Sequence, residues 1–527
     1  MARFIAAMLV FAMISAGATG TAVYGEEYPT VVLPEVPIRI EGVEASVSGF
    51  LGETERGPAE PRLVTSWDEY SILYGGNKNT SSYLPHSVRG FFENGGKKLY
   101  VARVIDSEAA SAAVKLLAGK APALTLRAIG EGSWGNRIQI RVSEASGSSE
   151  YNPMFRLEIS YWDAKPFDIM RNPKLSKLKT YPYVTEVFDN LSMNHEDKNF
   201  YKDKINGNSR LITADKEAGD LGLIPDSFKE PVFLNGGNDG GNIDLEDYLG
   251  YNKSPAAVRG LAALDAIDEI SLLYCPDALS VAGLAQELIH SCEKLEDRIV
   301  ILDSKNGDTG PMGDEDFNSS YAALYYPWIM IDEGLETQRT VPPGGHIAGI
   351  YALTEAQYGI SKAPAGMVIK GAKGLEFSID EHDTDILNSR GVNSIRDFPG
   401  RGITVWGART LALEADEEYR YVNLRRMKNY IEESIREGLS YTSDCYNNQE
   451  LWARVKSAVT DFLTQEWRKG CFAGTTARDA FYVMVDRSTM NQADIEEGRL
   501  IIDIGAAFLR PAEFYIIRIM LPVWGSN

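Results

Sequence analysis

The sequence predicts a multidomain protein with α/β and α+β parts, in which a β-rich module interrupts the α/β part. Its 527 residues amount to several typical domains. Strand and helix patterns alternate over 43–120 and 231–405, as in parallel α/β sheets. Period-two alternation dominates 121–230, and two long amphipathic helices precede three strands in 406–527.

Composition favours a folded protein and argues against nucleic-acid binding. Hydrophobic residues make up 44% and charged residues 24% of the chain. The net charge is −21, whereas nucleic-acid binding depends on Lys and Arg contacts with phosphates. The four cysteines form no CxxC pair, so no zinc site or other cofactor is predicted.

The first 25 residues have the layout of a secretory signal peptide, with Arg3 ahead of an apolar run over 4–14. Two other interpretations stay open, a start codon placed too early and an extra N-terminal arm. The run is too short for an ordinary spanning helix, and no other segment is long and apolar enough. We therefore expect no stable membrane association.

Residues 26–42 predict an extended arm. Pro29, Pro34 and Pro37 lie among β-branched residues, and proline fixes φ while removing a hydrogen-bond donor. The next segment, 43–120, predicts a small α/β unit. Its expected elements are a strand over 43–51, a helix capped near 65–66, a helix over 82–94 and a strand over 99–104.

Residues 121–230 predict an inserted β-rich domain, with strands over 124–127, 137–142 and 155–161 and a polar loop over 165–179. Residues 231–405 return to α/β. Strands over 270–275 and 298–303 flank a helix whose apolar residues span 281–295, which predicts a parallel βαβ unit. A further strand is expected over 325–330, and a helix from Pro342 and Pro343 to about Gly359.

The last segment, 406–527, predicts helices over 421–437 and 449–469 and strands over 481–485, 500–504 and 514–520. Gly438 is the expected end of the first helix, and Asn448 is the expected cap of the second. Acidic residues at 414 and 416–418 fit a helix start.

An enzyme is an alternative because Asp277 and Asp303 lie at strand ends, where α/β sheets bind ligands. A hydrolase triad is poorly supported, since the chain has only five histidines, at 86, 195, 290, 346 and 382, and no GxSxG or HExxH motif. His346, at a helix start, makes an anion site conceivable.

The glycine-rich stretch 235–241 lacks the Lys-Ser/Thr of a phosphate loop. The nearby acidic residues do not have calcium-loop spacing, so an exposed acidic turn is the better interpretation; they are Asp239, Asp244, Glu246 and Asp247.

Longer motifs are more specific. The most extensive is PGRGITVWGARTL at 399–411, preceded by GVNSIR at 391–396 and followed by YVNLRR at 421–426 and PAEF at 511–514. Earlier blocks agree in order and spacing: IEGV at 40–43, RGP at 56–58, VTSW at 64–67, VRGFFENGG at 88–96, VPPGG at 341–345 and AGIY at 348–351. Over about 28–522 the chain resembles the tail sheath proteins of contractile phage tails and related contractile injection systems.

The resemblance implies a structural subunit and not an enzyme. It implies stacked hexameric rings around an inner tube protein, with baseplate and tail terminator proteins as further partners and assembly in the cytoplasm. Contraction would drive the tube through a target envelope. The central domain would have a subtilisin-like topology without a catalytic triad. An exported surface-layer or adhesion protein is the other alternative, motivated only by residues 1–25.

The resemblance also implies that both terminal arms add strands to neighbouring subunits, and the extended character of 26–42 fits this. The predicted inter-subunit residues are Val31, Val32, Val36, Ile38, Ile40, Phe514, Ile516, Arg518 and Met520. Two places depart from the family pattern. Tyr28-Pro29-Thr30 matches the usual Pro-Gly-Val-Tyr loosely, which leaves the arm's register open, and Cys445-Tyr446-Asn447 replaces Glu-Pro-Asn.

Overall fold

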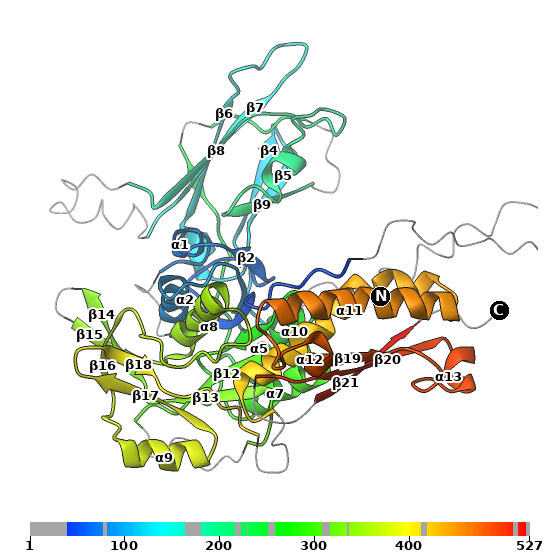
Figure 1. Ribbon diagram of the computed structural model, residues 1–527. Helices are drawn as coiled ribbons and strands as arrows, with labels where there is room; N and C mark the ends of the chain where they lie inside the picture. The colour runs from blue at the N-terminus through cyan, green and yellow to red at the C-terminus, as the bar shows by residue number, and fades with distance from the viewer. Residues whose placement is uncertain are drawn as a thin grey trace, which may run out of the picture.

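The computed structural model shows a mixed α/β multidomain protein (Figure 1). It describes residues 39–522 except 77–81, 164–180, 217–222, 229, 251–258, 308–316, 335–336, 413–418 and 510–514. Among the helices within these limits, none is long and apolar enough to cross a bilayer.

An eight-stranded sheet, the central sheet, organises the molecule. Its order is β18-β17-β13-β12-β11-β1-β3-β2. The six strands from β17 to β3 run parallel, and β18 and β2 pair antiparallel at the two edges. The strands are β1 (Ser48–Glu53), β2 (Arg62–Val64), β3 (Leu99–Val104), β11 (Leu272–Tyr274), β12 (Ile299–Asp303), β13 (Ala322–Tyr326), β17 (Val392–Phe398) and β18 (Gly402–Val405).

The pairing of β1 with β11 joins two segments that the sequence prediction kept apart. Residues 43–120 and 231–405 contribute to one sheet, separated in sequence by the inserted module. The predicted parallel βαβ unit is confirmed, because β11 and β12 are parallel neighbours joined by α7 (Leu284–Leu295).

Helices cover both faces of the central sheet. One core layer holds α2 (Leu84–Glu93) and α8 (Gly344–Tyr358), and α1 (Trp67–Tyr74) packs beside α2. The other holds α5 (Leu245–Leu249), α6 (Gly260–Asp265) and α7. Successive strand residues enter opposite layers: Phe50 packs with the first and Leu51 with the second, as the two-residue period of a strand requires.

The strand predicted over 325–330 is two strands. Pro327 has no N–H to give to a central ladder, and β13 ends at Tyr326 before it. Beyond it β14 (Ile329–Gly334) belongs to a different sheet, between β15 (Thr337–Val341) and β16 (Ala372–Leu375). The helix α9 (Glu381–Ser389) packs against β17.

The inserted module projects from the central sheet, at the top of Figure 1. It has two sheets around one core. One contains β4 (Ala113–Ala118), β5 (Ala121–Ala128) and β9 (Ile212–Lys216); the other contains β6 (Ile138–Glu144), β7 (Phe155–Tyr161), β8 (Val184–Leu191) and β10 (Val232–Phe233), and α4 (Tyr201–Ile205) completes the module. Bridges of Ala110 to Asn238 and Ala113 to Asn235 close it, so the module is wider than the predicted 121–230.

The C-terminal domain places two long helices on one face of a three-stranded sheet, the terminal sheet. Its strands, in spatial order, are β19 (Phe481–Met484), β20 (Arg499–Ala506) and β21 (Tyr515–Pro522). The helices are α10 (Val422–Gly438) and α11 (Gln449–Arg468), with α12 (Ala477–Ala480) and α13 (Gln492–Glu496) as short additions. Asn448 caps α11 as predicted, because its side-chain oxygen accepts the N–H of Leu451 at 3.0 Å. The acidic residues predicted to start the first helix lie outside the described residues.

The segment 39–47 links the two domains before the first strand begins. Val43 donates its N–H to Ser434 Oγ at 3.1 Å, and Arg426 Nη2 donates to the carbonyl of Ala45 at 2.7 Å. The predicted strand over 43–51 therefore starts only at Ser48, because the residues before it lie along α10 and not in a sheet.

Candidate assembly interface

The strand-end aspartates are both engaged in holding the fold together. Asp303, which ends β12, accepts the N–H of Gly344 at 2.7 Å at the start of α8. Its burial raises the pKa of the carboxyl to about 7, against the opposing effect of the Tyr274 hydroxyl and the Gly344 N–H. Asp277 accepts the Tyr248 hydroxyl at 3.0 Å, and burial raises its pKa as well. Both carboxyl groups therefore accept a hydrogen bond within the chain, although Asp303 Oδ2 is buried without a partner among the described residues.

His346 is packed and does not complete a catalytic arrangement. Within the described chain no hydrogen bond joins it to Asp303, and a Cβ added at Gly90 would lie 2.4 Å from its imidazole. Burial lowers the pKa of His346 to about 3 and that of His86 to about 4, so both rings are neutral at pH 7. At this helix start, where we considered an anion, the N–H of Gly344 is already bonded to Asp303 of the same chain.

The acidic residues around the glycine-rich stretch serve as caps and bridges. Asp239 accepts the N–H and the hydroxyl of Ser133 at 2.7 and 2.6 Å. Asp244 caps α5 through the N–H groups of Glu246 and Asp247. Among the residues that the structure describes, no group of three or more His, Cys, Asp or Glu side chains is placed to hold a metal ion.

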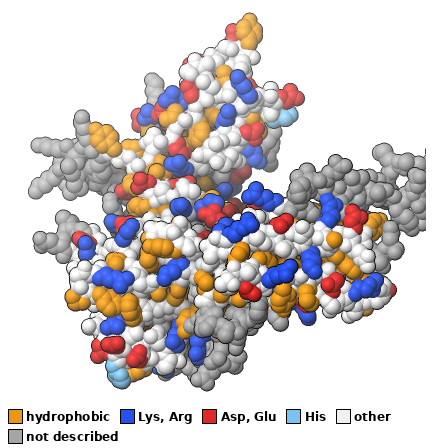
Figure 2. Space-filling model, in the orientation of Figure 1, with side chains coloured by type: hydrophobic (Ala, Val, Ile, Leu, Met, Phe, Trp, Pro, Cys, Tyr) orange, Lys and Arg blue, Asp and Glu red, His pale blue; other side chains and the backbone are white. Residues whose placement is uncertain are grey.

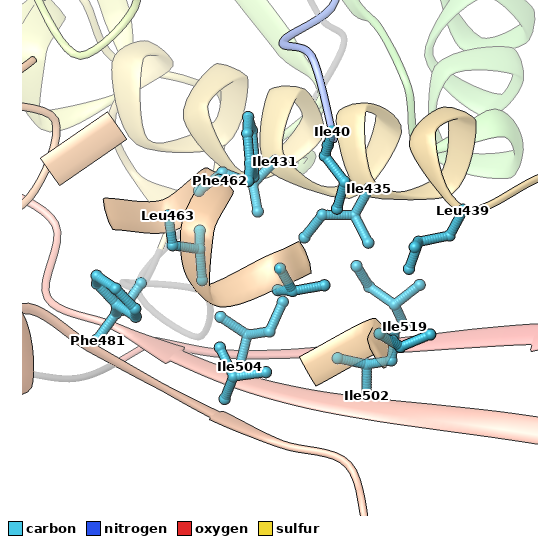
Figure 3. Close-up of a cluster of buried hydrophobic side chains, with 14 of the residues drawn as sticks. Ile40, Ile431, Ile435, Leu439, Phe462, Leu463, Phe481, Ile502, Ile504 and Ile519 are labelled. Carbon is cyan, nitrogen blue, oxygen red and sulfur yellow. The ribbon is translucent and has the colours of Figure 1, made fainter. Parts of the chain in front are cut away.

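The terminal sheet offers a surface of a different kind, because α10 and α11 cover one of its faces. Phe481, Val483, Ile502, Ile504 and Ile519 point toward α10 and α11 and form a core (Figure 3). Of the alternate residues, Tyr482, Met484 and Met520 are exposed, whereas Ile501 and Asp503 of the middle strand are 6% and 8% exposed. The two faces therefore differ in exposure mainly along the outer strands.

The outward face carries exposed apolar side chains and ion pairs. Tyr482, Met484 and Met520 are 38%, 36% and 49% exposed. Tyr482 lies opposite Gly505, where an added Cβ would meet the tyrosine ring at 2.1 Å, so glycine leaves the space that the ring fills. Arg518 donates to both carboxylate oxygens of Asp503, at 2.8 and 3.2 Å. Figure 2 shows hydrophobic and basic side chains interleaved over this part of the molecule.

The strand β21 forms an open edge of the terminal sheet. All of its eight residues pair with β20, and within the described residues no strand lies on its other side. An open edge presents main-chain donors and acceptors to any extended segment. Its bounds match the predicted final strand to within two residues.

The predicted inter-subunit residues fall into three groups. Ile516, Arg518 and Met520 lie on β21, whereas the other C-terminal residue, Phe514, lies outside the described residues. Most of the N-terminal group also lies outside them, namely Val31, Val32, Val36 and Ile38.

Ile40 alone of the N-terminal group is placed, and it is buried in its own chain. It is 3% exposed and packs against Ile431, Ile435 and Leu439 (Figure 3). Gly438 allows this approach, because an added Cβ there would lie 2.9 Å from Ile40. The base of the arm is therefore anchored on the C-terminal domain from which the open edge also comes.

Sequence reasoning missed the outward residues Tyr482 and Met484. The run FYVMV at 481–485 is apolar throughout, so its alternation carries no polar signal that would separate the two faces. The glycine opposite Tyr482 is in another strand, and only the register brings the two together.

Two adjacent parts of the chain match known families. Residues 242–411 match the phage tail sheath protein central domain, and residues 414–521 match the phage tail sheath C-terminal domain. A putative prophage major tail sheath protein of Pseudomonas aeruginosa is 24% identical over 251 residues, which cover 46% of this chain and 62% of that protein. The tail sheath protein of Burkholderia phage BcepMu is 24% identical over 204 residues, covering 37% and 42%. The chain thus aligns with less than two thirds of each of these relatives.

Solved structures share the fold over nearly the whole chain. A sheath tail protein of Listeria innocua superposes with a TM-score of 0.62 at 12% identity, covering 92% of this chain and 96% of that one. The contracted sheath complex of the extracellular contractile injection system PVC gives a TM-score of 0.54 at 20% identity, covering 95% and 98%. At these identities the likeness is one of fold.

Proposed function

Since the chain belongs to the phage tail sheath protein family, we propose that it is a structural subunit of a contractile sheath, which assembles with copies of itself and catalyses no reaction. The observation that carries the proposal is the pair of adjacent sheath-domain matches, which together account for 242–411 and 414–521. The roles of Asp277 and Asp303 in holding the fold together support it, because the two carboxylates that motivated the enzyme alternative both accept hydrogen bonds within the chain.

The assembly that we propose is a stack of hexameric rings around an inner tube protein. Baseplate and tail terminator proteins would bound the stack, and assembly would take place in the cytoplasm. Contraction would drive the tube through a target envelope. The PVC sheath that shares this fold was solved in a contracted state, which supports a contractile role for the fold.

We also propose how subunits are joined. The arm over 26–38 of one subunit would add a strand to the open edge of β21 on a neighbour, where main-chain hydrogen bonds give affinity. The anchoring of Ile40 supports this, because it fixes the base of the arm on the C-terminal domain, which also carries the open edge. On this proposal the outward residues Arg518 and Met520 lie beside the junction.

We also propose a topology for the central domain. The resemblance implies a subtilisin-like central domain, and the parallel central sheet with helices on both faces supports it. Superposition on a subtilisin tests it, since the strand order β3-β1-β11-β12-β13-β17 must be reproduced. The division into an arm, a central domain, an inserted module and a C-terminal domain is testable by limited proteolysis at their junctions.

Electron microscopy of the purified chain tests the function. We expect hollow tubes with six-fold symmetry when the full chain is concentrated. Monomers that persist across all salt concentrations and protein concentrations would contradict the proposal.

A pair of deletions tests the arm. Removal of 26–38 leaves Ile40 and its core contacts intact, so the subunit should stay folded and soluble but form no tubes. Removal of 1–25 is the matched control and should leave tube formation unchanged. Intact tubes from the first deletion would refute the arm's role.

A further inference from the structure

A cavity of about 200 Å³ lies where the central sheet meets α10. One wall comes from residues just before three parallel strands: Lys98 before β3, Asp268 and Glu269 before β11, and Asp297 before β12. The opposite wall is α10. We call this space the interdomain cavity. It is larger than an engineered cavity of about 150 Å³ that accepts benzene, so a small organic group fits in it.

The charges around the cavity do not balance. Six carboxylates and two cations line it. Both cations are already held: Lys98 Nζ lies 2.6 Å from Glu44, and Arg426 Nη2 lies 2.6 Å from Glu355, which lies outside the lining. In the described chain neither cation forms an ion pair with the remaining five carboxylates, although Lys98 also attracts Glu269.

Those five carboxylates are only partly compensated. Asp297 is paired with Arg298 at 2.6 Å, and Glu433 faces Arg436 at 3.8 Å. Glu269 accepts the Tyr100 hydroxyl. In the described part of the chain, Asp268 and Glu437 have no ion pair. Burial is the largest cause of the raised pKa of Glu433. Arg436 opposes the rise, and the nearby carboxylates of Asp297, Glu437 and Asp268 add to it.

A buried acceptor in the cavity wall also lacks a donor. Asn429 of α10 is 5% exposed and lines the cavity. Its Oδ1 has no hydrogen-bond partner among the described residues, and its Nδ2 donates only to the carbonyl of Arg298 at 3.4 Å. Leaving a buried acceptor unsatisfied costs free energy that a donor ligand would recover.

We propose that the interdomain cavity binds an organic cation, an alkylammonium or guanidinium group, which donates to Asn429 Oδ1 and bridges Asp268 on the sheet side with Glu437 on α10. A metal ion fits less well, because the described residues hold no group of three or more ligands arranged for one. The same chemistry has two sources, a free amine or a Lys or Arg side chain of a second copy. In either case the cation would tie the two domains together.

Calorimetry on the full-length chain tests the free-amine source. Putrescine titrated into the monomer should bind saturably with one site, whereas butanediol, its neutral analogue, should not bind. The double variant Glu433→Gln/Glu437→Gln should weaken putrescine binding at least tenfold. The double variant Glu450→Gln/Glu496→Gln removes the same charge at exposed sites of the same domain and should leave binding unchanged.

A second variant separates a built site from general charge attraction. Asn429→Leu keeps every charge and removes the acceptor, so putrescine binding should still fall severalfold. Circular dichroism checks that each variant is folded. Binding that responds only to net charge, equally in the cavity and the control variants, would overturn the proposal.

The second source is tested on assembled tubes, and this arm alone rests on the proposed function. If a neighbour supplies the cation, the monomer binds no putrescine, but tubes of the cavity double variant dissociate at lower salt than tubes of the control variant. A wild-type chain that forms no tubes at all refutes the proposed function instead. Absence of putrescine binding, combined with either equal tube stability or no tubes, overturns the cavity proposal.

Discussion

The central sheet meets its two neighbouring units through joints that differ in their surroundings. In the joint to the inserted module a buried arginine packs on two tyrosine rings. The joint to the C-terminal domain surrounds the interdomain cavity and is crowded with carboxylates. Both joints use a buried arginine, Arg56 in the first and Arg426 in the second, so their difference lies in what surrounds that residue.

The joint to the inserted module is packed around Arg56. Arg56 is 1% exposed, and its guanidinium lies 4.6 and 4.9 Å from the ring centroids of Tyr161 and Tyr183. It donates to the carbonyl of Ser71 at 2.8 Å. Glu55 accepts the Tyr161 hydroxyl at 3.2 Å from the other side.

The joint to the C-terminal domain has two buried arginines and several carboxylates. Arg426 donates to the carbonyl of Ala45 and pairs with Glu355. Arg425 is 4% exposed, donates to Ser320 Oγ at 2.5 Å and lies 4.1 Å from the ring centroid of Tyr321. The comparison teaches that both joints rest on buried arginines, and that they differ in the cavity and the carboxylates beside Arg426.

The largest effect is expected from Arg426→Met. The substitution leaves Glu355 half-buried without its cation and Ala45 without its donor, which should lower the free energy of unfolding by about 3–5 kcal/mol. Chemical denaturation measures it. Arg436→Met on the same helix is the control, because Arg436 is about half exposed and 3.8 Å from its partner. Equal losses in the two variants would contradict the importance given to Arg426.

A smaller loss is expected from Arg56→Met. The variant gives up a charged hydrogen bond and the contacts with two tyrosine rings, for about 2–3 kcal/mol of unfolding free energy. Faster proteolysis between the central sheet and the inserted module should accompany it. The control is Arg127→Met, whose side chain is 49% exposed. If Arg127→Met destabilises the chain as much, the joint around Arg56 has no special role.

The smallest expected effect is on the pH dependence of stability, and it tests the carboxylates at the joint to the C-terminal domain. Burial and neighbouring carboxylates raise the pKa of Glu433, so the folded chain keeps this proton to a higher pH than the unfolded chain. The stability that Glu433 contributes is therefore lost as pH rises from about 4.5 through its folded pKa.

Denaturation of Glu433→Gln across this pH window tests the assignment. The unfolding free energy of the variant should increase relative to that of the wild type as pH rises. The difference should stay below about 1 kcal/mol because the Glu433 side chain is partly exposed. Glu496→Gln should track the wild type throughout. If the unfolding free energies of the wild type and Glu433→Gln change in parallel with pH, the neighbouring carboxylates do not affect Glu433.

The sequence by itself determined the local elements and the order of the units. Helical periodicity placed α10 and α11 to within about two residues, and the prolines at 342 and 343 placed the start of α8. Asn448 was identified as a cap because its side-chain chemistry acts within one turn. The three strands of the terminal sheet were found because short apolar runs are a local signal. The family motifs were visible for the same reason.

Tertiary structure alone decided which distant residues meet. The pairing of β1 with β11 makes one sheet of two segments separated by the inserted module, and no local pattern encodes that neighbour. The sequence predicted Ile40 as part of an extended arm, whereas the fold buries it against Ile435. The interdomain cavity forms because residues before three strands face one helix. Their charges interact there because Coulomb energies depend on separation in space and on burial, and not on position in the chain.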